Sequence, residues 1–590
     1  KHSIEVPDTV GPDGVFLDKV PLFAGRSVLT PRGKEGDANQ AVVEALVGSG
    51  ALLASGKLTH SYPHSWRSKA PLIFRNTSQW FISMDKAGLR EAALKAIGET
   101  RFFPPSGRKR LHGMIKTRPD WCVSRQRAWG VPITVFVDKK TGQPLRDEKV
   151  FQRIVEAVES EGADAWFDSD PSRFLSPDYA AGDYEQVIDI LDVWFDSGST
   201  HAFVLEARED LEWPASLYLE GTDQHRGWFH SSLLESCGTR GAAPYEAVLT
   251  HGFVMGEDGQ KMAKSLGNIV SPQDVAGRHG ADIMRLWVVG SDYSEDLRIG
   301  PDILKQHADV YRRLRNTMRF LLGNLNEFDE GERLDPADMP ELERWVLHRV
   351  GELDRMLRKA CTEFHFHFLF SELHNFCAAD LSAFYFDIRK DCLYCDRADS
   401  ITRRAARTVL DKLFDCLTAW LAPFICFTAE ESWLARHPGD DESVHLRLFP
   451  EIPEAWRDDK LAEKWKTVRD IRRVVTGAME LKRTQKKIGS SLEAAPMVYL
   501  DSRWNGVLEG IDFAEICITS GITIGSHADY HDDPNADTFS LPDAPGVIVS
   551  FERASGDKCE RCWKFLEEVG NDPEHPGLCG RCADAVRSRV

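Results

Sequence analysis

The feature that most constrains the fold of this 590-residue chain is a change of pattern near residue 301. Upstream, short apolar runs alternate with glycines and polar clusters. Downstream, apolar residues recur at helical spacing. One such stripe, with intervals of four and three, consists of Val409, Leu413, Leu417 and Trp420. A chain this long also exceeds a single hydrophobic core. The sequence therefore predicts an α/β part followed by an all-α bundle, with helices near 303–326, 341–360 and 364–390.

A glycine-rich segment, His251–Asn268, places Lys261 and Lys264 three residues apart. Glycines allow backbone conformations that other residues avoid, and flexible lysine side chains can then bring their charges to a polyphosphate. These residues predict a mobile phosphate-binding loop. The alternative is a solvated turn that carries two surface lysines.

Polar side chains cluster where predicted strands end. Asp189–His201 is predicted as a buried strand that ends in a Ser-Gly turn, and Tyr218–Ser236 as a strand that leads into a helix. The second junction carries Glu220, Asp223 and Gln224. Such groups at the carboxyl end of a strand suit a ribose, an amine or an adenylate, although each alone could be a helix cap or a surface group.

Two further stretches of the first part have a distinct composition. In Arg118–Ile133, Arg125 and Arg127 alternate with tryptophans, which fits either a functional element or a solvated basic loop. Residues 134–184 are acidic, contain scattered proline and glycine, and show no clear periodicity. We interpret them as a variable insertion.

The chain ends with two Cys-x-x-Cys pairs separated by sixteen residues: Cys559, Cys562, Cys579 and Cys582. Four thiolates at this spacing are typical of a structural zinc site, and metal binding would supply most of the folding energy of so short a segment. Trp563 either covers the metal or offers a stacking surface to RNA bases. Another pair, Cys392 and Cys395, has no partner pair nearby, so we interpret it as structural.

Charge restricts the classes of partner. The net charge of −19 argues against a protein that coats nucleic acid indiscriminately. Residues 463–487 nevertheless hold nine Lys and Arg against three acids, which predicts a local RNA-backbone stripe with Arg472, Lys482 and Arg483 as contacts, or else a solvated helix face. No run approaches the roughly 18 apolar residues of a membrane span, and no signal peptide is recognisable. We predict a cytoplasmic protein with reduced thiols and no membrane partner.

Several blocks resemble, in order, motifs of the class I aminoacyl-tRNA synthetases. KMAKS at 261–265 resembles the KMSKS loop, with Ala263 in place of serine. WCVSRQRAWG at 121–130 and EGTDQHRGWF at 220–229 resemble the elements WCxSRQRxWG and EGxDQHRGWF. With the terminal KCERCW, this combination resembles the bacterial isoleucyl-tRNA synthetases. The valyl and leucyl families share only part of it.

This resemblance implies a ligase that forms isoleucyl-adenylate from isoleucine and ATP with Mg²⁺, then transfers isoleucine to tRNA(Ile), as a monomer. It implies roles for Lys261 and Lys264 on the ATP phosphates, for Glu220, Asp223 and Gln224 on the adenylate, for Trp194 and Trp228 beside the amino-acid side chain, and for Trp563 on tRNA. Many relatives carry a zinc-binding cysteine pair where this chain has Ser65 and Ser68, so we predict no metal there.

The resemblance also divides the chain into five parts. They are the tail of an inserted editing domain over 1–57, the second half of a Rossmann-like nucleotide-binding catalytic domain over 58–300, an α-helical anticodon-binding domain over 301–455, a small α/β junction module over 456–550 and a Cys₄ zinc ribbon over 551–590. The family's HIGH signature and editing motifs are missing from the sequence, so we expect an N-terminally truncated chain, inactive alone. A valyl- or leucyl-type synthetase and a non-catalytic tRNA-binding protein remain as alternatives.

Overall fold

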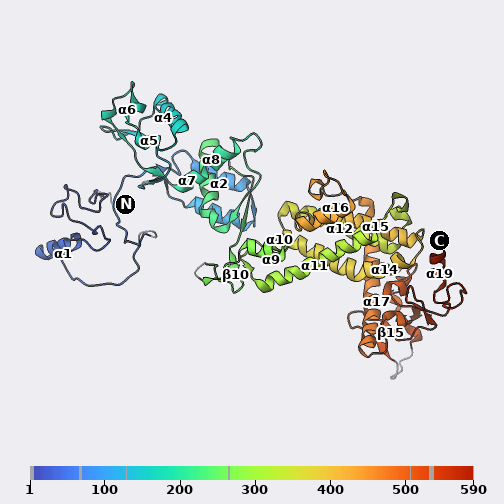
Figure 1. Cartoon of the computed structure of the whole chain (residues 1–590). Coiled ribbons are helices and arrows are strands. Elements are labelled where there is room, and N and C mark those ends of the chain that lie inside the picture. The colour runs from blue at the N-terminus through green and yellow to red at the C-terminus, as the bar shows by residue number, and fades with distance from the viewer. Residues whose placement is uncertain are drawn as a thin grey trace. The chain divides into compact units, whose positions relative to one another are not determined.

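The computed structural model describes residues 6–65, 69–127, 129–263, 266–504, 506–530 and 537–588. The chain forms two compact units, Lys1–Leu249 and Thr250–Val590 (Figure 1). The first unit is α/β and the second is dominated by helices, so the fold classes expected from the change of pattern are confirmed.

A three-stranded sheet lies at the centre of the first unit. Its order is β2 (Arg101–Phe103), β9 (Ala247–His251) and β8 (Tyr218–Gly221), and β2 runs parallel to β9. Three helices pack with the sheet around one apolar core: α2 (Leu89–Glu99), α3 (Ser106–Lys116) and α8 (Trp228–Arg240). The first turn of α8 follows the end of β8 closely, so polar residues between them are held beside the sheet.

Shorter elements complete the first unit. They are α1 (Ala38–Gly48), β1 (Phe81–Ile82), which pairs with β3 (Trp121–Cys122), β4 (Ser124–Arg125), which pairs with β7 (Ile190–Leu191), and β5 (Phe136–Asp138), which pairs with β6 (Tyr184–Gln186). All three pairs are antiparallel.

Residues 134–184 form a small folded lobe with its own core, so the expectation of a segment without periodicity was wrong. The helices of this lobe are α4 (Glu148–Glu161), α5 (Ala165–Asp168) and α6 (Ser172–Leu175). The Asp147 side chain caps α4, and the buried Val150, Ile154 and Ala157 follow at helical spacing. Trp166 is completely buried at the centre. The apolar residues of α4 recur at helical spacing in the sequence, but the acidic residues between them made this pattern hard to recognise.

The strand predicted over Asp189–His201 is also only partly correct. Residues Ile190–Leu191 form β7, but α7 (Val193–Gly198) begins directly after it. The Asp192 side chain accepts a hydrogen bond from the Trp194 amide and so caps the helix. An aspartate cap therefore overrides the strand propensity of the apolar residues that follow.

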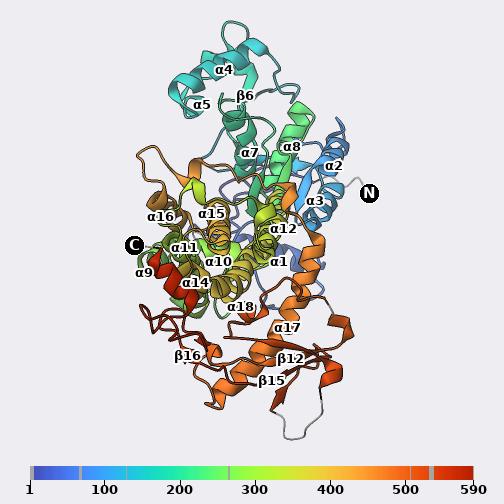
Figure 2. The ribbon, with the colours of Figure 1, turned by 90° about the vertical axis from the view of Figure 1, so that its right-hand side faces the viewer.

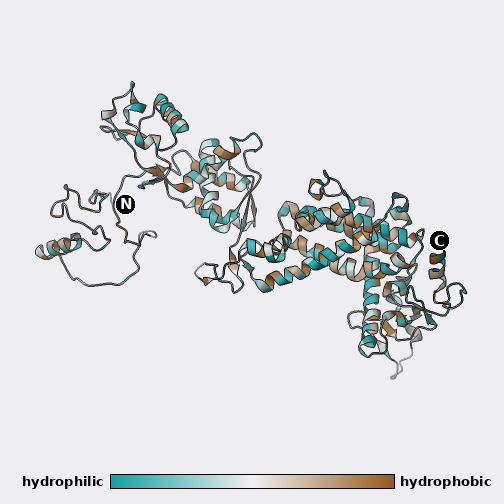
Figure 3. Ribbon diagram, in the orientation of Figure 1, coloured by the Kyte–Doolittle hydropathy of each residue, from teal (hydrophilic) through white to brown (hydrophobic). Residues whose placement is uncertain are grey.

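The second unit begins with a parallel pair, β10 (Val254–Gly256) and β11 (Leu297–Ile299), linked through α9 (Pro272–His279) and α10 (Ala281–Gly290). The bundle consists of α11 (Pro301–Asn324), α12 (Glu341–Glu363), α13 (Phe366–Asn375), the π-helix η7 (Phe376–Tyr385), α14 (Phe386–Cys395), α15 (Ile401–Leu421) and α16 (Cys426–Arg436). Apolar and polar residues alternate around these helices (Figure 3). Val409, Leu413, Leu417 and Trp420 are completely buried in α15.

The C-terminal part combines a long helix with a small sheet (Figure 2). Helix α17 (Asp459–Thr484) packs on a sheet of order β13 (Thr523–Ser526), β12 (Met497–Leu500), β15 (Val547–Ser550) and β14 (Thr538–Phe539), with α18 (Phe513–Cys517) beside it. The last segment contains β16 (Asp557–Lys558), β17 (Phe565–Leu566) and α19 (Gly580–Arg587). One continuous apolar core joins the bundle to the α17 sheet. No described helix is both long and apolar enough to cross a bilayer.

Candidate functional site

Two tryptophans meet at the junction of β8, α7 and α8. A Cβ atom on Gly227 would lie 2.7 Å from the Trp194 ring and 2.4 Å from Gln224 Oε1, so only glycine fits where that ring crosses the start of α8. Trp228 stacks on Tyr218 with ring centroids 4.1 Å apart, and its indole N–H donates to the Ser197 carbonyl at 3.0 Å. The structure therefore places the Trp194 ring beside Gly227, the residue before Trp228, and fixes the Trp228 ring.

The three polar residues of this junction lie on one short stretch of chain. Gln224 donates to the Asp223 carboxylate at 3.1 Å and accepts from the Trp228 amide at 2.9 Å. The side chains of Glu220 and Asp223 are exposed. Gln224 thus anchors the first turn of α8, while both carboxylates remain available to a ligand.

A cavity of about 290 Å³ opens beside Trp194. It is lined by Arg118, Pro119, Asp120, Trp121, Cys122, Arg125, Asp192, Trp194, Arg226, Gly227, His230 and Ser231. Arg125 and Asp192 form an ion pair at 2.8 Å, which joins the basic loop to the cap of α7. Arg118, Trp121 and Arg125 of this loop thus form part of the cavity wall, whereas Arg127 and Trp129 are exposed and do not line it.

His230 is the cavity residue that sequence reasoning missed. It is 4% exposed, and neither ring nitrogen has a hydrogen-bond partner among the described residues. Burial, and then the charge of Arg118, lower the pKa of His230 to about 3, so the ring is neutral at physiological pH. Both nitrogens of a neutral imidazole can serve a polar group, one as donor and one as acceptor. The only sequence signal was its place directly after the EGTDQHRGWF block.

The lysine loop lies in the second unit. Lys261 is exposed and pairs in an antiparallel bridge with Met255 of β10. Between them, Gly259 takes a left-handed backbone conformation with φ of 76°, which closes the turn. Asn268 accepts from the Ala263 amide at 2.9 Å and holds the far side of the loop. Lys264 lies outside the described residues, as does Ser68.

The basic helix is α17, and two of its three predicted RNA contacts are corrected by their surroundings. Lys482 is 1% exposed, pairs with Asp537 and lies 5.7 Å from the Phe551 ring centroid. Arg472 donates to the Ile516 carbonyl at 2.8 Å and is partly buried over Phe384. Both side chains hold the fold instead of facing solvent. Arg483 is exposed.

The four terminal cysteines form the candidate metal centre. Their Sγ atoms all lie within 4.8 Å of one another and all four residues are buried. Four converging thiols with no other ligand type fit a tetrahedral structural Zn²⁺ site, as predicted from the spacing. Trp563 follows a ligand directly and is 60% exposed, with the Lys558 ammonium 5.3 Å from its ring centroid. It therefore does not bury the metal.

The interpretation of Cys392 and Cys395 as an isolated pair needs correction. Cys392 is buried in the bundle core. Cys395 instead packs with the four zinc-site cysteines in a separate cluster. The two side chains lie in different surroundings although they are only three residues apart, and Cys395 is the last residue of α14.

Comparisons with known proteins agree with this architecture. Residues 19–300 match the family model "tRNA synthetases class I (I, L, M and V)", residues 343–498 match "Anticodon-binding domain of tRNA ligase", and residues 556–585 match "Zinc finger found in FPG and IleRS". The third match overlies the four clustered cysteines, so the chain ends in a zinc finger.

Three curated relatives, each from a different bacterium, are all named isoleucine–tRNA ligase. The chain is 56% identical over 595 residues to the isoleucine–tRNA ligase of Brucella abortus (strain 9-941), covering 99% of this chain and 60% of the relative. The relative from Ruegeria pomeroyi is 54% identical, with 97% of this chain and 61% of the relative covered. The relative from Caulobacter vibrioides is 52% identical, with 99% of this chain and 60% of the relative covered. The chain thus spans about 60% of the length of these relatives.

A solved methionyl-tRNA synthetase of Mycobacterium tuberculosis in complex with methionyl-adenylate is 16% identical and covers 67% of this chain and 71% of its own, with a TM-score of 0.47. That level of likeness fixes neither fold nor site. Three family models match in order and the curated isoleucine–tRNA ligases are more than half identical along nearly the whole of this chain, so the chain is similar throughout to the isoleucine–tRNA ligases, and its residues 19–300 match the class I tRNA synthetases.

Proposed function

We propose that the protein to which this sequence belongs attaches isoleucine to tRNA(Ile). In the first step isoleucine and ATP, with Mg²⁺, give isoleucyl-adenylate and pyrophosphate; in the second, isoleucine moves to the 3′ end of the tRNA. The observation that supports this most strongly is the 56% identity over 595 residues with an isoleucine–tRNA ligase. We expect a monomer that works in the cytoplasm, where tRNA is charged.

Amino-acid recognition is assigned to Trp194 and Trp228. Flat aromatic rings offer a branched aliphatic side chain an apolar contact surface without water, and they give a polar side chain no hydrogen-bond partner. Gly227 supports this role because it lets the Trp194 ring lie across the start of α8. The exposed carboxylates of Glu220 and of Asp223, which accepts a hydrogen bond from Gln224, would bind hydroxyl or amino groups of the adenylate.

Phosphate chemistry is assigned to Lys261 and Lys264. Negative charge builds up on the leaving pyrophosphate as the adenylate forms, and nearby ammonium groups stabilise that charge. The exposed position of Lys261 beside a glycine turn suits a side chain that must reach a flexible polyphosphate. Ala263 lacks the hydroxyl of the serine in KMSKS but leaves both ammonium groups in place.

tRNA binding is assigned to two surfaces of the second unit. A shallow groove of about 430 Å³ at the end of α17 is lined by Arg483, Lys486, Lys487, Ile488, Gly489, Glu493 and Arg553. Its four cations suit a phosphate backbone, and Arg483 is the one contact predicted on α17 that remains. The exposed indole of Trp563 suits stacking with an unpaired base.

The lysine role is tested by ATP–pyrophosphate exchange in the full-length protein. Lys264→Ala should slow isoleucine-dependent exchange by on the order of 10²-fold, as the loss of a transition-state donor does. Lys305→Ala, which removes an exposed lysine on α11, is the matched control and should leave the rate unchanged. Equal rates for Lys264→Ala and the control would refute the assignment.

The Trp563 role is tested by comparing two assays. Trp563→Ala should lower kcat/KM for tRNA in aminoacylation by roughly 10-fold, since stacking on one base is worth about 1–3 kcal/mol. ATP–pyrophosphate exchange should not change, because the ribbon folds around its own metal. Trp563→Phe, which keeps an aromatic face, should restore most of the loss. If both assays fell together, Trp563 would be a structural residue.

A further inference from the structure

A fifth cysteine lies against the zinc centre. Cys395, the last residue of α14, packs with Cys559, Cys562, Cys579 and Cys582 in one cluster of buried residues. Its thiol donates to the Arg561 carbonyl oxygen at 3.6 Å, and the same cluster holds Cys582. Four thiolates complete the tetrahedral coordination of Zn²⁺. Cys395 is therefore a surplus thiol in contact with a metal ligand.

Arginines of the ribbon hold this contact in register. The Arg561 guanidinium donates to the carbonyls of Tyr394, at 2.9 Å, and Cys395. Arg581 makes two bonds to the Asp391 carboxylate at 2.6 and 2.8 Å and a third to Asp396 at 3.0 Å. Bidentate pairs of this kind fix orientation as well as distance. The end of α14 and the ribbon are thus fastened on both sides of the Cys395 sulfur.

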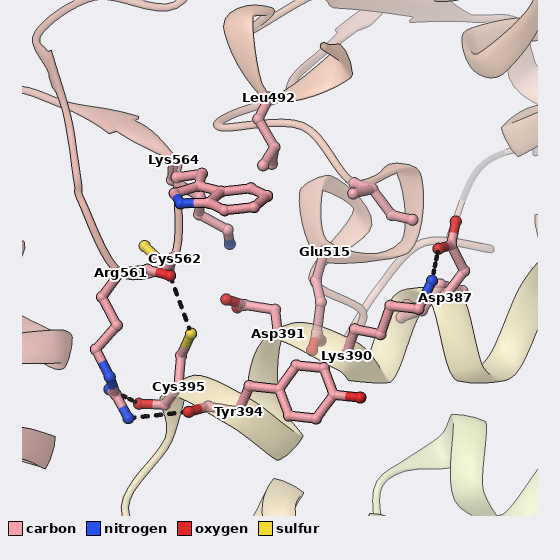
Figure 4. Close-up of a pocket in the computed structure, with 13 residues that line it drawn as sticks. Asp387, Lys390, Asp391, Tyr394, Cys395, Leu492, Glu515, Arg561, Cys562 and Lys564 are labelled. Carbon is pink, nitrogen blue, oxygen red and sulfur yellow. Dashed lines mark hydrogen bonds and ion pairs between the residues drawn. The ribbon is translucent and has the colours of Figure 1, made fainter. Parts of the chain in front are cut away.

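A cavity gives small molecules a path to this sulfur. It measures about 380 Å³, is lined mainly by apolar surface, and has both Cys395 and Cys562 in its wall (Figure 4). A water molecule occupies only about 30 Å³ in the liquid, so a peroxide fits easily. Trp563, more than half exposed, stands at the same cavity. Among the remaining buried thiols, Cys377, Cys392, Cys416 and Cys517 lie in the main apolar core.

We propose that Cys395 is a site of reversible oxidation by peroxides, and that its disulfide with Cys582 releases the zinc. The Cys395 sulfur attacks one peroxide oxygen, the O–O bond breaks, and the second oxygen leaves with the thiol proton as water, which gives a sulfenic acid. The Cys582 thiolate then leaves the metal and attacks that sulfur. The S–O bond breaks, hydroxide departs and the S–S bond forms. Two sulfurs have each lost one electron, and the peroxide has gained both.

The product would join α14 covalently to α19 and leave three cysteines for the metal. Three thiolates no longer close the coordination shell, so zinc affinity falls and Zn²⁺ dissociates. Loss of the metal would disorder the turn that presents Trp563. A resulting loss of tRNA charging rests on the proposed function, whereas zinc release and the disulfide do not.

The experiment treats the zinc-loaded protein with hydrogen peroxide and follows released zinc with a chromogenic chelator. The wild type should release close to one equivalent, and peptide mass spectrometry without reductant should find Cys395 linked to Cys582. Cys395→Ser should release zinc about 10-fold more slowly, because no neighbouring thiol remains to drive the exchange. Cys392→Ser, three residues away on the same helix and in the bundle core, is the matched control and should behave as the wild type. Thiol reductant with added zinc should reverse the change.

Two results would overturn the proposal. One is release from Cys395→Ser at the wild-type rate. The other is mass spectrometry of the oxidised wild type that finds disulfides only among the four ligands and none to Cys395. This second measurement uses the wild type alone, so it remains decisive even if Cys395→Ser binds zinc poorly. Neither depends on aminoacylation. Failure of the proposed function would show in the pyrophosphate exchange assay and would leave the zinc release intact.

Discussion

At the scale of single residues, the first unit holds a carboxyl group in an unusual setting. Glu235 on α8 is 8% exposed, and one of its oxygens has no partner among the described residues. A Cβ atom on Gly198 would lie only 2.1 Å from that oxygen, so the backbone of α7 is packed directly against it. Burial, and then the charge of Asp196, raise the pKa of Glu235 to about 9. The group is therefore a neutral acid at physiological pH.

This pKa makes stability depend on pH. Between the ordinary pKa of glutamate and about 9 the folded state binds more protons than the unfolded state, so the free energy of unfolding should fall as pH rises through that window. Glu235→Gln keeps the shape and removes the titration. Its advantage over the wild type should be small near pH 5 and grow by at most about 1.4 kcal/mol per pH unit up to pH 9.

Denaturant unfolding at several pH values measures this difference. Glu91→Gln on the exposed side of α2 is the control and should run parallel to the wild type. A Glu235→Gln curve that also ran parallel to the wild type would mean that the carboxyl is ionised in the folded protein.

At the scale of elements, a buried ion pair joins three helices. Arg389 on α14 binds both carboxylate oxygens of Glu343 on α12, at 2.6 and 2.7 Å, and one oxygen of Glu515 on α18 at 2.7 Å. The Tyr385 hydroxyl adds a bond to Glu343 at 3.0 Å. Arg389 and Glu343 are 3% and 0% exposed. Every charge in this group has a partner, which is the condition for burying it.

Removing one partner should be costly. Arg389→Ala leaves the buried Glu343 and the partly buried Glu515 without their cation and should lower the free energy of unfolding by about 3–5 kcal/mol. The adjacent Lys390 pairs with Asp387 at 2.8 Å on the exposed side of the same helix. Lys390→Ala should change stability by no more than about 1 kcal/mol, because solvent screens such pairs. Chemical denaturation of both variants measures the contrast, and equal losses would contradict it.

The elements also mark how far sequence reasoning reaches. Helices such as α15 were predictable because apolar residues repeat over many turns, and the zinc site because four cysteines carry the signal within one short segment. Strands of two or three residues, such as β7, are too short to show the alternation of apolar and polar residues that identifies a strand. The Asp192 side chain caps the helix α7 that follows β7, and this cap cannot be recognised from the apolar residues alone. Lys482 can be buried because its ammonium group forms an ion pair with Asp537, which is 55 residues away in the sequence. Cys395 meets Cys582 for the same reason: such pairs form only through tertiary packing.

At the scale of the whole molecule, we expect the ribbon to depend on its metal for folding and the bundle core to fold without it. The cysteines of the ribbon form a small cluster of their own, separate from the large core of the bundle. Ion pairs in both directions join the ribbon to the bundle: Arg581 of the ribbon binds Asp391, and Arg397 of the bundle binds Asp584. Exposed pairs of this kind contribute little without a folded partner.

Metal analysis should find one zinc per chain. After removal by a chelator, amide hydrogen exchange should accelerate in residues 556–588 while α15 remains protected, since the bundle core contains no metal ligand. Readdition of zinc should restore the slow exchange. Faster exchange throughout α15 would show that the ribbon stabilises the bundle as well.

The continuous core that joins the bundle to the α17 sheet has a consequence for synthesis on the ribosome. Its members run from Leu286 to Val549, so the helices made first cannot complete their packing until β15 has left the exit tunnel. At about 5–20 residues per second, that interval lasts roughly 10–50 seconds. During it the nascent chain presents the apolar faces of α11 to α15 to chaperones. Ribosome-bound chains of increasing length should therefore gain protease resistance in one late step, after β15 emerges, and not helix by helix.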